Sequence, residues 1–142
     1  MTGKILIIED SMVQAMRLQD TLEAHGLQVR CANYGETGIE LACQWQPDAV
    51  VLDLMMPAVD GYEVCRRLLA DSRTSNIPII TMSGNPADVA REQSLVAGAV
   101  EFIPKGGFAY AVLLETLRQL RVLGVVEGET TPAIGGALDY EG

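Results

Sequence analysis

Short apolar runs alternate five times with longer segments of helical spacing along this chain of 142 residues. The runs are too short for helices and are typical of strands buried in a sheet. Strands that are separated by helices pair in parallel, and the crossover between two of them is right-handed. The pattern therefore predicts an α/β fold, a doubly wound parallel sheet of five strands with five helices on its two faces.

The positions of glycine and proline, together with the hydrophobic pattern, set the boundaries of these elements. The expected strands are 4–8, 27–31, 49–53, 77–82 and 100–103, and the expected helices are 12–25, 36–45, 61–70, 86–97 and 108–123. Apolar and polar residues alternate in the second strand, which favours a place at the edge of the sheet. Because the pattern stops at Gly124, we expect one domain at 1–123 and a disordered, acidic and glycine-rich tail at 124–142.

The charge and hydropathy of the chain exclude several classes of partner. A net charge of −9 argues against nucleic acid, and no cluster of basic residues exceeds the pair Arg66-Arg67. No apolar run approaches the ~18 residues of a membrane span. The first residues lead straight into a strand rather than into a signal peptide. We therefore expect a cytoplasmic protein that neither inserts into a membrane nor binds nucleic acid directly.

Cysteine and histidine offer little reactive chemistry in this sequence. Cys31, Cys43 and Cys65 lack CxxC spacing and fall within apolar segments, which predicts buried free thiols rather than a disulfide or a metal site. His25 has no partner motif nearby, and we expect it on the surface.

Acidic residues follow two of the expected strands. Glu9 and Asp10 come directly after the first strand, followed by Ser11 as a helix N-cap, and Asp53 ends the third strand. The carboxylates should converge if these strands are parallel neighbours. Two such charges ~5 Å apart repel by roughly 3 kcal/mol at an effective dielectric constant of about 20, which a proton or a cation would relieve. Oxygen ligands of this kind suit Mg²⁺, although one of the acids could instead only cap a helix.

The same edge of the sheet should receive a hydroxyl and an ammonium group. Ser83 follows the fourth strand, and Lys105 follows the fifth. A cation, a lysine and a hydroxyl neutralise the charge of a phosphoryl group during transfer, and a carboxylate can attack phosphorus to give an acyl phosphate. The set therefore predicts phosphoryl transfer to Asp53. Taken singly, Ser83 is equally consistent with a strand-end cap, and Lys105 with a solvated loop residue.

In combination these residues resemble the receiver domains of two-component response regulators, which share the flavodoxin-like fold of the chemotaxis response regulator. Glu9-Asp10 is similar to the acidic pair of that family, Ser83 stands at its Thr/Ser position, and Lys105 stands at its lysine position. The segment DLMMPAVDG at 53–61 is close to the family signature DxxMPxxDG. The resemblance covers residues 4–123 and implies the strand order 2-1-3-4-5.

The resemblance implies a role for each residue of the site. Asp53 would accept a phosphoryl group from a histidine kinase, and Ser83 and Lys105 would hold the phosphoryl oxygens. Phe102 matches the aromatic switch position, which turns inward as the Ser83 hydroxyl moves toward the phosphate; the alternative for Phe102 is a core aromatic fixed in one rotamer. The implied ligands of Mg²⁺ are Glu9 (through water), Asp10, Asp53 and the backbone carbonyl of Met55.

The resemblance also implies partners. A sensor histidine kinase or a phosphotransfer protein would act upstream, and a protein target would bind downstream. No basic helix-turn-helix follows Leu123. We therefore expect a stand-alone receiver that switches its binding to a partner protein, or a homodimer that forms through the last helix-strand-helix face.

The lysine loop departs from the family pattern. Pro104 precedes Lys105 and Gly106 follows it, whereas the family usually has proline directly after the lysine, so the reach of the lysine is open. One alternative function is an interaction module of the same fold that takes no phosphate. Another is an aspartyl phosphohydrolase, but such an enzyme needs a second acid two residues after its nucleophile, where this chain has Met55. We therefore expect a phosphoacceptor that is not a turnover enzyme.

Overall fold

The computed structural model contains a five-stranded parallel sheet in the order β2-β1-β3-β4-β5. It describes residues 3–54, 60–84 and 87–122. Within them the sheet order, the α/β class and the alternation of five strands with five helices confirm the predicted fold. The strands are β1 (Lys4–Ile8), β2 (Gln28–Ala32), β3 (Ala49–Asp53), β4 (Ile79–Ser83) and β5 (Glu101–Pro104), and the helices are α1 (Met12–Ala24), α2 (Gly35–Trp45), α3 (Gly61–Ala70), α4 (Ala87–Val96) and α5 (Ala109–Gln119).

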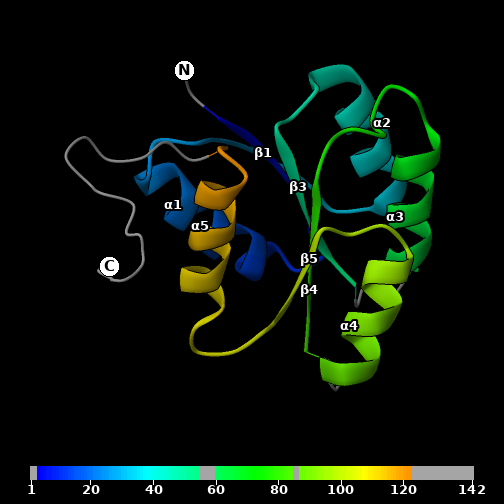
Figure 1. Cartoon of the computed structure of the whole chain (residues 1–142). Coiled ribbons are helices and arrows are strands. Elements are labelled where there is room, and N and C mark those ends of the chain that lie inside the picture. Colours follow the sequence, from blue (N-terminus) through cyan, green and yellow to red (C-terminus); the bar gives the residue numbers. More distant parts are fainter. Residues whose placement is uncertain (1–2, 55–59, 85–86, 123–142) are drawn as a thin grey trace.

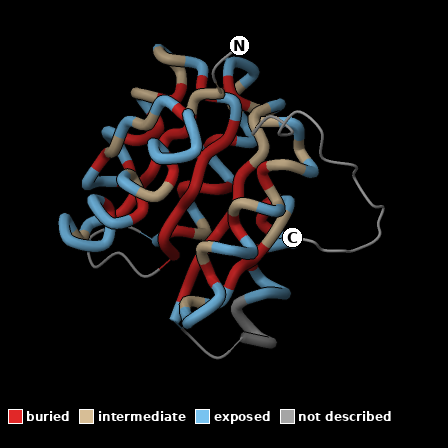
Figure 2. The backbone as a smooth tube through the Cα atoms, turned by 90° about the vertical axis from the view of Figure 1, so that its left-hand side faces the viewer, coloured by how far each residue is buried: buried red, intermediate tan, exposed pale blue. Residues whose placement is uncertain are grey.

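Helices cover both faces of the sheet, with α1 and α5 on one face and α2, α3 and α4 on the other (Figure 1). Each face has its own apolar core, because successive residues of a strand point to opposite sides. Figure 2 shows the buried positions concentrated in the central strands. Fully buried side chains include Ile5, Ile7, Leu22, Leu113 and Leu117 on the α1–α5 face and Leu6, Ile8, Leu52, Leu68 and Ile79 on the opposite face.

β2 lies at one edge of the sheet, as its alternating pattern predicts. Gln28 and Arg30 are exposed, whereas Val29 and Cys31 between and after them are half-buried. The strand pairs only with β1 in the sheet order, so one of its backbone edges faces away from the sheet. This explains why its hydrophobic pattern differs from that of the continuous apolar runs in β1 and β3.

Three strands differ from the prediction in their bounds. β2 and β5 are each shifted by one residue, to Gln28–Ala32 and Glu101–Pro104, and β4 is Ile79–Ser83. β4 begins at Ile79 rather than at residue 77, because Ile77 closes a turn by donating its N–H to the Thr74 carbonyl at 3.0 Å. β5 includes Pro104 as its last residue. Proline is compatible with that place because β5 is an edge strand, and a missing N–H at its end costs no hydrogen bond within the sheet.

The last helix is shorter than predicted. α5 ends at Gln119 rather than at 123, because Arg121 adopts a left-handed backbone conformation with φ 65°. The N–H of Val122 then bonds back to the Leu117 carbonyl at 2.9 Å. The helical spacing predicts that Leu113 and Leu117 face the core. This prediction is correct, because both side chains are fully buried.

Some predictions concern residues outside the described ranges. The expected helix start at Asn85-Pro86 and the expected tail at 124–142 both lie there. Among the described residues, no helix has the combination of length and apolar character that a bilayer crossing requires.

The cysteines are free, as predicted, but only one of them is fully buried. Cys65 lies in the core, and burial raises the pKa of its thiol to about 11. Cys31 and Cys43 are only half-buried, so the prediction that they are buried is wrong for these two. His25 is exposed, as predicted, and its ring Nδ1 lies 3.0 Å from the Thr21 carbonyl oxygen.

Gly61 allows α3 to begin close to the end of β3. A Cβ atom on Gly61 would lie 2.7 Å from the Cα of Leu54 and 3.2 Å from the carbonyl oxygen of Asp53. Both are backbone atoms, which cannot rotate away as a flexible side chain can. Asp60 supports the same junction, because its side chain accepts a hydrogen bond from the Tyr62 N–H at 2.9 Å and caps the helix.

We expect Gly61→Ala to lower the free energy of unfolding by about 1–3 kcal/mol, because the added methyl group must displace backbone next to Asp53. Gly106→Ala is the matched control, since nothing lies within 4 Å of a Cβ atom at that position. Urea denaturation of both variants measures the difference. Equal stability of the two variants would show that the close approach at Gly61 does not constrain the fold.

Candidate functional site

Three acidic side chains meet where β1 and β3 end. Glu9 and Asp10 follow β1, and Asp53 is the last residue of β3, which pairs in parallel with β1. One carboxylate oxygen from each of the three lies within 4.8 Å of the other two. Glu9 and Asp53 are buried, with 7% and 5% of their surface exposed, whereas Asp10 is exposed. The parallel register thus brings together acids that are distant in the sequence.

Backbone donors fix Glu9 at this edge. Its own N–H donates to the Ala32 carbonyl at 3.0 Å, which extends the β1–β2 ladder by one residue. Its Oε2 accepts a hydrogen bond from the Ser11 N–H at 3.1 Å. Ser11 in turn caps α1, as predicted, because its Oγ accepts from the Gln14 N–H at 3.3 Å. The first turn of α1 is therefore tied directly to the acidic cluster.

Burial raises the pKa of Glu9 from 4.5 to about 7, because the charged carboxylate loses hydration. A hydrogen bond and charge repulsion from Asp53 act in the same direction. The Ser11 N–H and the Lys105 ammonium act in the opposite direction and only partly compensate. The site therefore favours a proton on Glu9 or a positive charge beside it.

Lys105 supplies such a charge. Its Nζ lies 3.4 Å from Asp53 Oδ1 and 3.5 Å from Glu9 Oε1, and it donates a hydrogen bond to Gln14 Oε1 at 2.6 Å. Its backbone N–H donates to the Ser83 carbonyl at 2.9 Å, which extends the β4–β5 ladder by one residue. The order of proline before lysine therefore does not prevent the ammonium from reaching the acids.

The other predicted site residues lie in different environments. Ser83 ends β4 at the same edge of the sheet and is completely buried. Phe102 is only 4% exposed and packs in the core beneath α2, α3 and α4, so its described position is inward. Met55 is outside the described residues. The roles assigned to Ser83, Phe102 and Met55 stay predictions.

The acidic cluster fits a hard divalent cation. Its three donors are carboxylate oxygens, which are the ligands that Mg²⁺ prefers, and they lie within 4.8 Å of one another. Two of the three side chains are buried, so their mutual repulsion is poorly screened by water. The residues present therefore suit Mg²⁺ in both chemical type and proximity.

Gln14 is a site residue that sequence reasoning missed. It lies in the first turn of α1, three residues after the N-cap Ser11, and its amide oxygen contacts the Lys105 ammonium. The sequence does place Gln14 near the Glu9-Asp10 pair. It does not reveal that the side chain of Lys105, 91 residues later, reaches this turn of α1.

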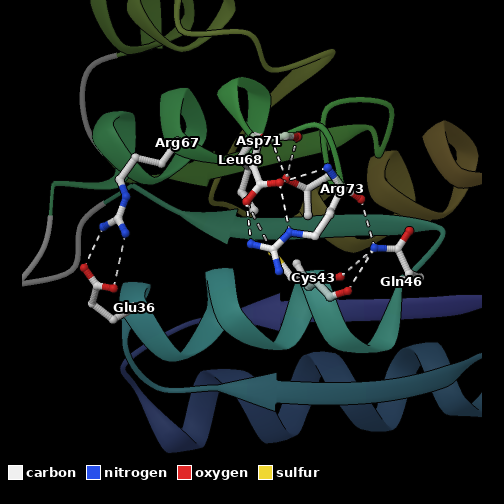
Figure 3. A network of polar contacts seen from close by, with 9 residues as sticks. Glu36, Cys43, Gln46, Arg67, Leu68, Asp71 and Arg73 are labelled. Carbon is white, nitrogen blue, oxygen red and sulfur yellow. Dashed lines mark hydrogen bonds and ion pairs between the residues drawn. The ribbon is translucent and has the colours of Figure 1, made fainter.

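A second polar cluster lies between α2 and α3 (Figure 3). It borders a groove of about 420 Å³. Arg67 contacts the two carboxylate oxygens of Glu36 at 2.6 and 3.3 Å, and Arg73 pairs with Asp71 at 2.8 Å. The hydrogen bonds from Arg73 hold the pKa of Asp71 well below its usual range. Because these charges pair with each other, the cluster joins α2, α3 and the loop after α3 rather than forming a reaction site.

A parallel sheet in this order, with acids and a lysine at its carboxyl edge, defines a flavodoxin-like α/β protein. Residues 5–118 match the family model described as the response regulator receiver domain. The chain therefore belongs to the receiver domain family of response regulators. Receiver domains are signalling modules of two-component systems, which act between histidine kinases and downstream targets.

Individual proteins support this assignment. The chain is 36% identical over 135 residues to the response regulator MprA of Mycobacterium sp. (strain KMS), a match that covers 94% of this chain and 57% of MprA. It is 35% identical over 103 residues to Protein PilH of Pseudomonas aeruginosa, with 72% of this chain and 85% of PilH covered. The chain thus spans little more than half the length of MprA.

A solved receiver domain shares the fold and contains a metal. The receiver domain of the sensor histidine kinase PA1611 from Pseudomonas aeruginosa PAO1 superimposes with a TM-score of 0.76 and 28% identity. The match covers 84% of this chain and 98% of that domain. In that protein a magnesium ion is coordinated in the active site cleft.

We expect Glu9→Gln to stabilise the magnesium-free protein at pH 8 by about 2 kcal/mol. The folded-state pKa of Glu9, about 7, is above its ordinary value of 4.5. The folded protein therefore retains a proton that the unfolded chain releases, and stability falls as the pH rises from 4.5 to 7. Glutamine carries no charge and removes this penalty.

Denaturation in EDTA at pH 4.5 and at pH 8 measures this effect as the difference between variant and wild type. Asp20→Asn is the matched control, because it removes one negative charge from an exposed position on α1. The gain from Glu9→Gln should appear at pH 8 and vanish at pH 4.5. A gain of the same size for Asp20→Asn would instead indicate a general effect of net charge.

Proposed function

We propose that Asp53 accepts a phosphoryl group from a histidine kinase or phosphotransfer protein in a Mg²⁺-dependent reaction, and that this modification switches the binding of a protein target. The observation that carries the proposal is the position of the Lys105 ammonium, 3.4 Å from Asp53 Oδ1 within a cluster of three acids. An ammonium group beside a buried carboxylate can stabilise the charge that a phosphoryl group brings to it.

The reaction is a nucleophilic substitution at phosphorus. A carboxylate oxygen of Asp53 attacks the phosphorus atom of a phosphohistidine, and a P–O bond forms as the P–N bond breaks. The leaving imidazole nitrogen keeps the electron pair and takes up a proton. The product is an acyl phosphate on Asp53. With acetyl phosphate as donor, a P–O bond breaks instead and acetate leaves.

The surrounding residues orient and neutralise the phosphoryl group. Lys105 would donate from its ammonium to a phosphoryl oxygen, and the Ser83 hydroxyl would move toward another. Phe102, the proposed aromatic switch, is inward in the structure, the position that the prediction gives to the phosphorylated state. When bound, Mg²⁺ would offset the negative charge of the phosphoryl oxygens. The proposed Mg²⁺ ligands are Asp10, Asp53 and the Met55 carbonyl, with Glu9 acting through water.

Other functions of the same fold are less well supported. An interaction module that takes no phosphate has no need of a lysine directed at buried acids, yet Lys105 contacts both Glu9 and Asp53. A phosphohydrolase lacks its general acid, because Met55 occupies the place two residues after Asp53. The function we propose is therefore that of a signalling module that loses its phosphoryl group slowly, and not that of a turnover enzyme.

The output of the module remains a set of predictions. They comprise a location in the cytoplasm, no direct binding of nucleic acid, and either a protein target or a homodimer that forms through the face of α4, β5 and α5. Phosphorylation of Asp53 would change which surface of this protein binds its partner. Size measurement with and without phosphodonor tests the homodimer.

Mass spectrometry is a better measure of phosphorylation here than tryptophan fluorescence. Trp45, the single tryptophan, ends α2 and accepts a hydrogen bond from Lys4 Nζ through its carbonyl at 2.8 Å. Lys4 starts β1 level with Asp48, so Trp45 lies near the end of the strands opposite to Asp53, roughly 16 Å away along a strand. A signal from Trp45 would report the site only indirectly.

We expect the wild-type protein to gain one phosphoryl group from acetyl phosphate in the presence of Mg²⁺, and Asp53→Asn to gain none. The substituted amide is not a nucleophilic carboxylate, which is why the variant should stay unmodified. Asp48→Asn is the matched control, because Asp48 stands just before the opposite end of the same strand. Intact-mass measurement follows the reaction. Modification of Asp53→Asn at the wild-type rate would place the acceptor elsewhere.

A further inference from the structure

A closed ring of four polar contacts connects the acidic cluster, the first turn of α1 and the loop after β5. Glu9 Oε2 accepts from the Ser11 N–H at 3.1 Å, and Ser11 Oγ accepts from the Gln14 N–H at 3.3 Å. Gln14 Oε1 accepts from Lys105 Nζ at 2.6 Å, and Lys105 Nζ returns to Glu9 Oε1 at 3.5 Å. Each residue of the ring is therefore held by two others.

From this geometry we propose that Gln14 is a positioning residue for Lys105, one that sets the rate at which Asp53 takes a phosphoryl group. The inference rests on the proposed phosphorylation of Asp53 and deepens it. Gln14 acts only through the lysine ammonium and takes no part in the chemistry at phosphorus.

Among the described residues three acceptors surround the Lys105 ammonium, as many as its N–H groups. The contact with Gln14, at 2.6 Å, is shorter than those with Asp53 at 3.4 Å and Glu9 at 3.5 Å. The Gln14 amide oxygen therefore holds the end of the Lys105 side chain. The other N–H groups of the ammonium are left for the carboxylates of Asp53 and Glu9. This leaves the ammonium in an ion pair with Asp53 that is longer, at 3.4 Å, than its hydrogen bond to Gln14 at 2.6 Å.

The charge of the acceptor matters for this role. A carboxylate at position 14 would hold the ammonium by an ion pair and would repel an incoming phosphoryl group. An apolar side chain would leave the lysine to the acids alone. An amide avoids both effects, because it accepts a hydrogen bond and carries no net charge.

The loop around Lys105 gives the lysine little other support. Gly106 and Gly107 follow it, and a Cβ atom at either position would meet nothing within 4 Å. The backbone N–H of Lys105 donates to the Ser83 carbonyl, which holds the main chain. The long side chain of Lys105 extends from there to Gln14 in the first turn of α1. A hydrogen bond at the far end of the side chain therefore restricts it where the loop does not.

The test compares Gln14→Met with Gln19→Met in the full chain. Methionine keeps the length of glutamine but loses the amide oxygen. Gln19 lies on the same helix and bonds to Glu23 and Cys31 rather than to Lys105, so its variant is the matched control. The rate of modification by acetyl phosphate with Mg²⁺ should fall about fivefold in Gln14→Met, the size expected for one hydrogen bond to a charged donor at an exposed site. It should not change in Gln19→Met.

A second background separates positioning from general damage to the fold. In Lys105→Ala protein, Gln14→Met should cause no further loss of rate, because the group that it positions is absent. An equal fivefold loss in both backgrounds would overturn the inference. The ¹³Cε resonance of Lys105 in the metal-free protein gives a readout that needs no phosphorylation: it should shift in Gln14→Met and stay unchanged in Gln19→Met.

The outcomes distinguish this inference from the function on which it rests. If the wild type takes a phosphoryl group and Gln14→Met takes it at the same rate, the role of Gln14 is wrong and the proposed function stands. If the wild type takes none, the proposed function is wrong and the inference fails with it. Where the Lys105→Ala background reacts too slowly to compare, an unshifted Lys105 resonance in Gln14→Met rejects the contact.

Discussion

Repulsion between like charges at one edge of the sheet is the constraint on which the rest of this structure depends. Glu9 and Asp53 are buried next to each other, and the fold keeps them there although the pKa of Glu9 rises as a result. Such an arrangement persists only when the surrounding structure is stable enough to impose it. Two separate apolar cores, one on each face of the sheet, supply that stability.

The parallel topology explains why the acids meet and how they are held. β1 and β3 are neighbours in register, so the residues that end them share an edge. Gly61 then brings α3 against the backbone after Asp53, and Ser11 joins α1 to Glu9. Helices from both faces of the sheet therefore begin at this edge, and their first turns fix the positions of the carboxylates.

Local pattern was sufficient to predict the fold class, the edge position of β2 and the placement of Glu9, Asp53, Ser83 and Lys105 at or next to the ends of their strands. It failed where a tertiary contact decides the outcome. Pro104 belongs to β5 because that strand lies at the edge of the sheet, and α5 stops early because Arg121 turns left-handed. Gln14 could not be recognised, since its contact with Lys105 joins residues that lie 91 positions apart in the chain.

β5 connects the two layers of the molecule at the site. Phe102 points into the core beneath α2, α3 and α4, whereas the ammonium of Lys105, three residues on, contacts α1 on the opposite layer. β5 has a hydrogen-bonded neighbour only on the side of β4, so it is less restrained than the central strands. A displacement of Lys105 would therefore act on both layers of the molecule through an edge strand of the sheet.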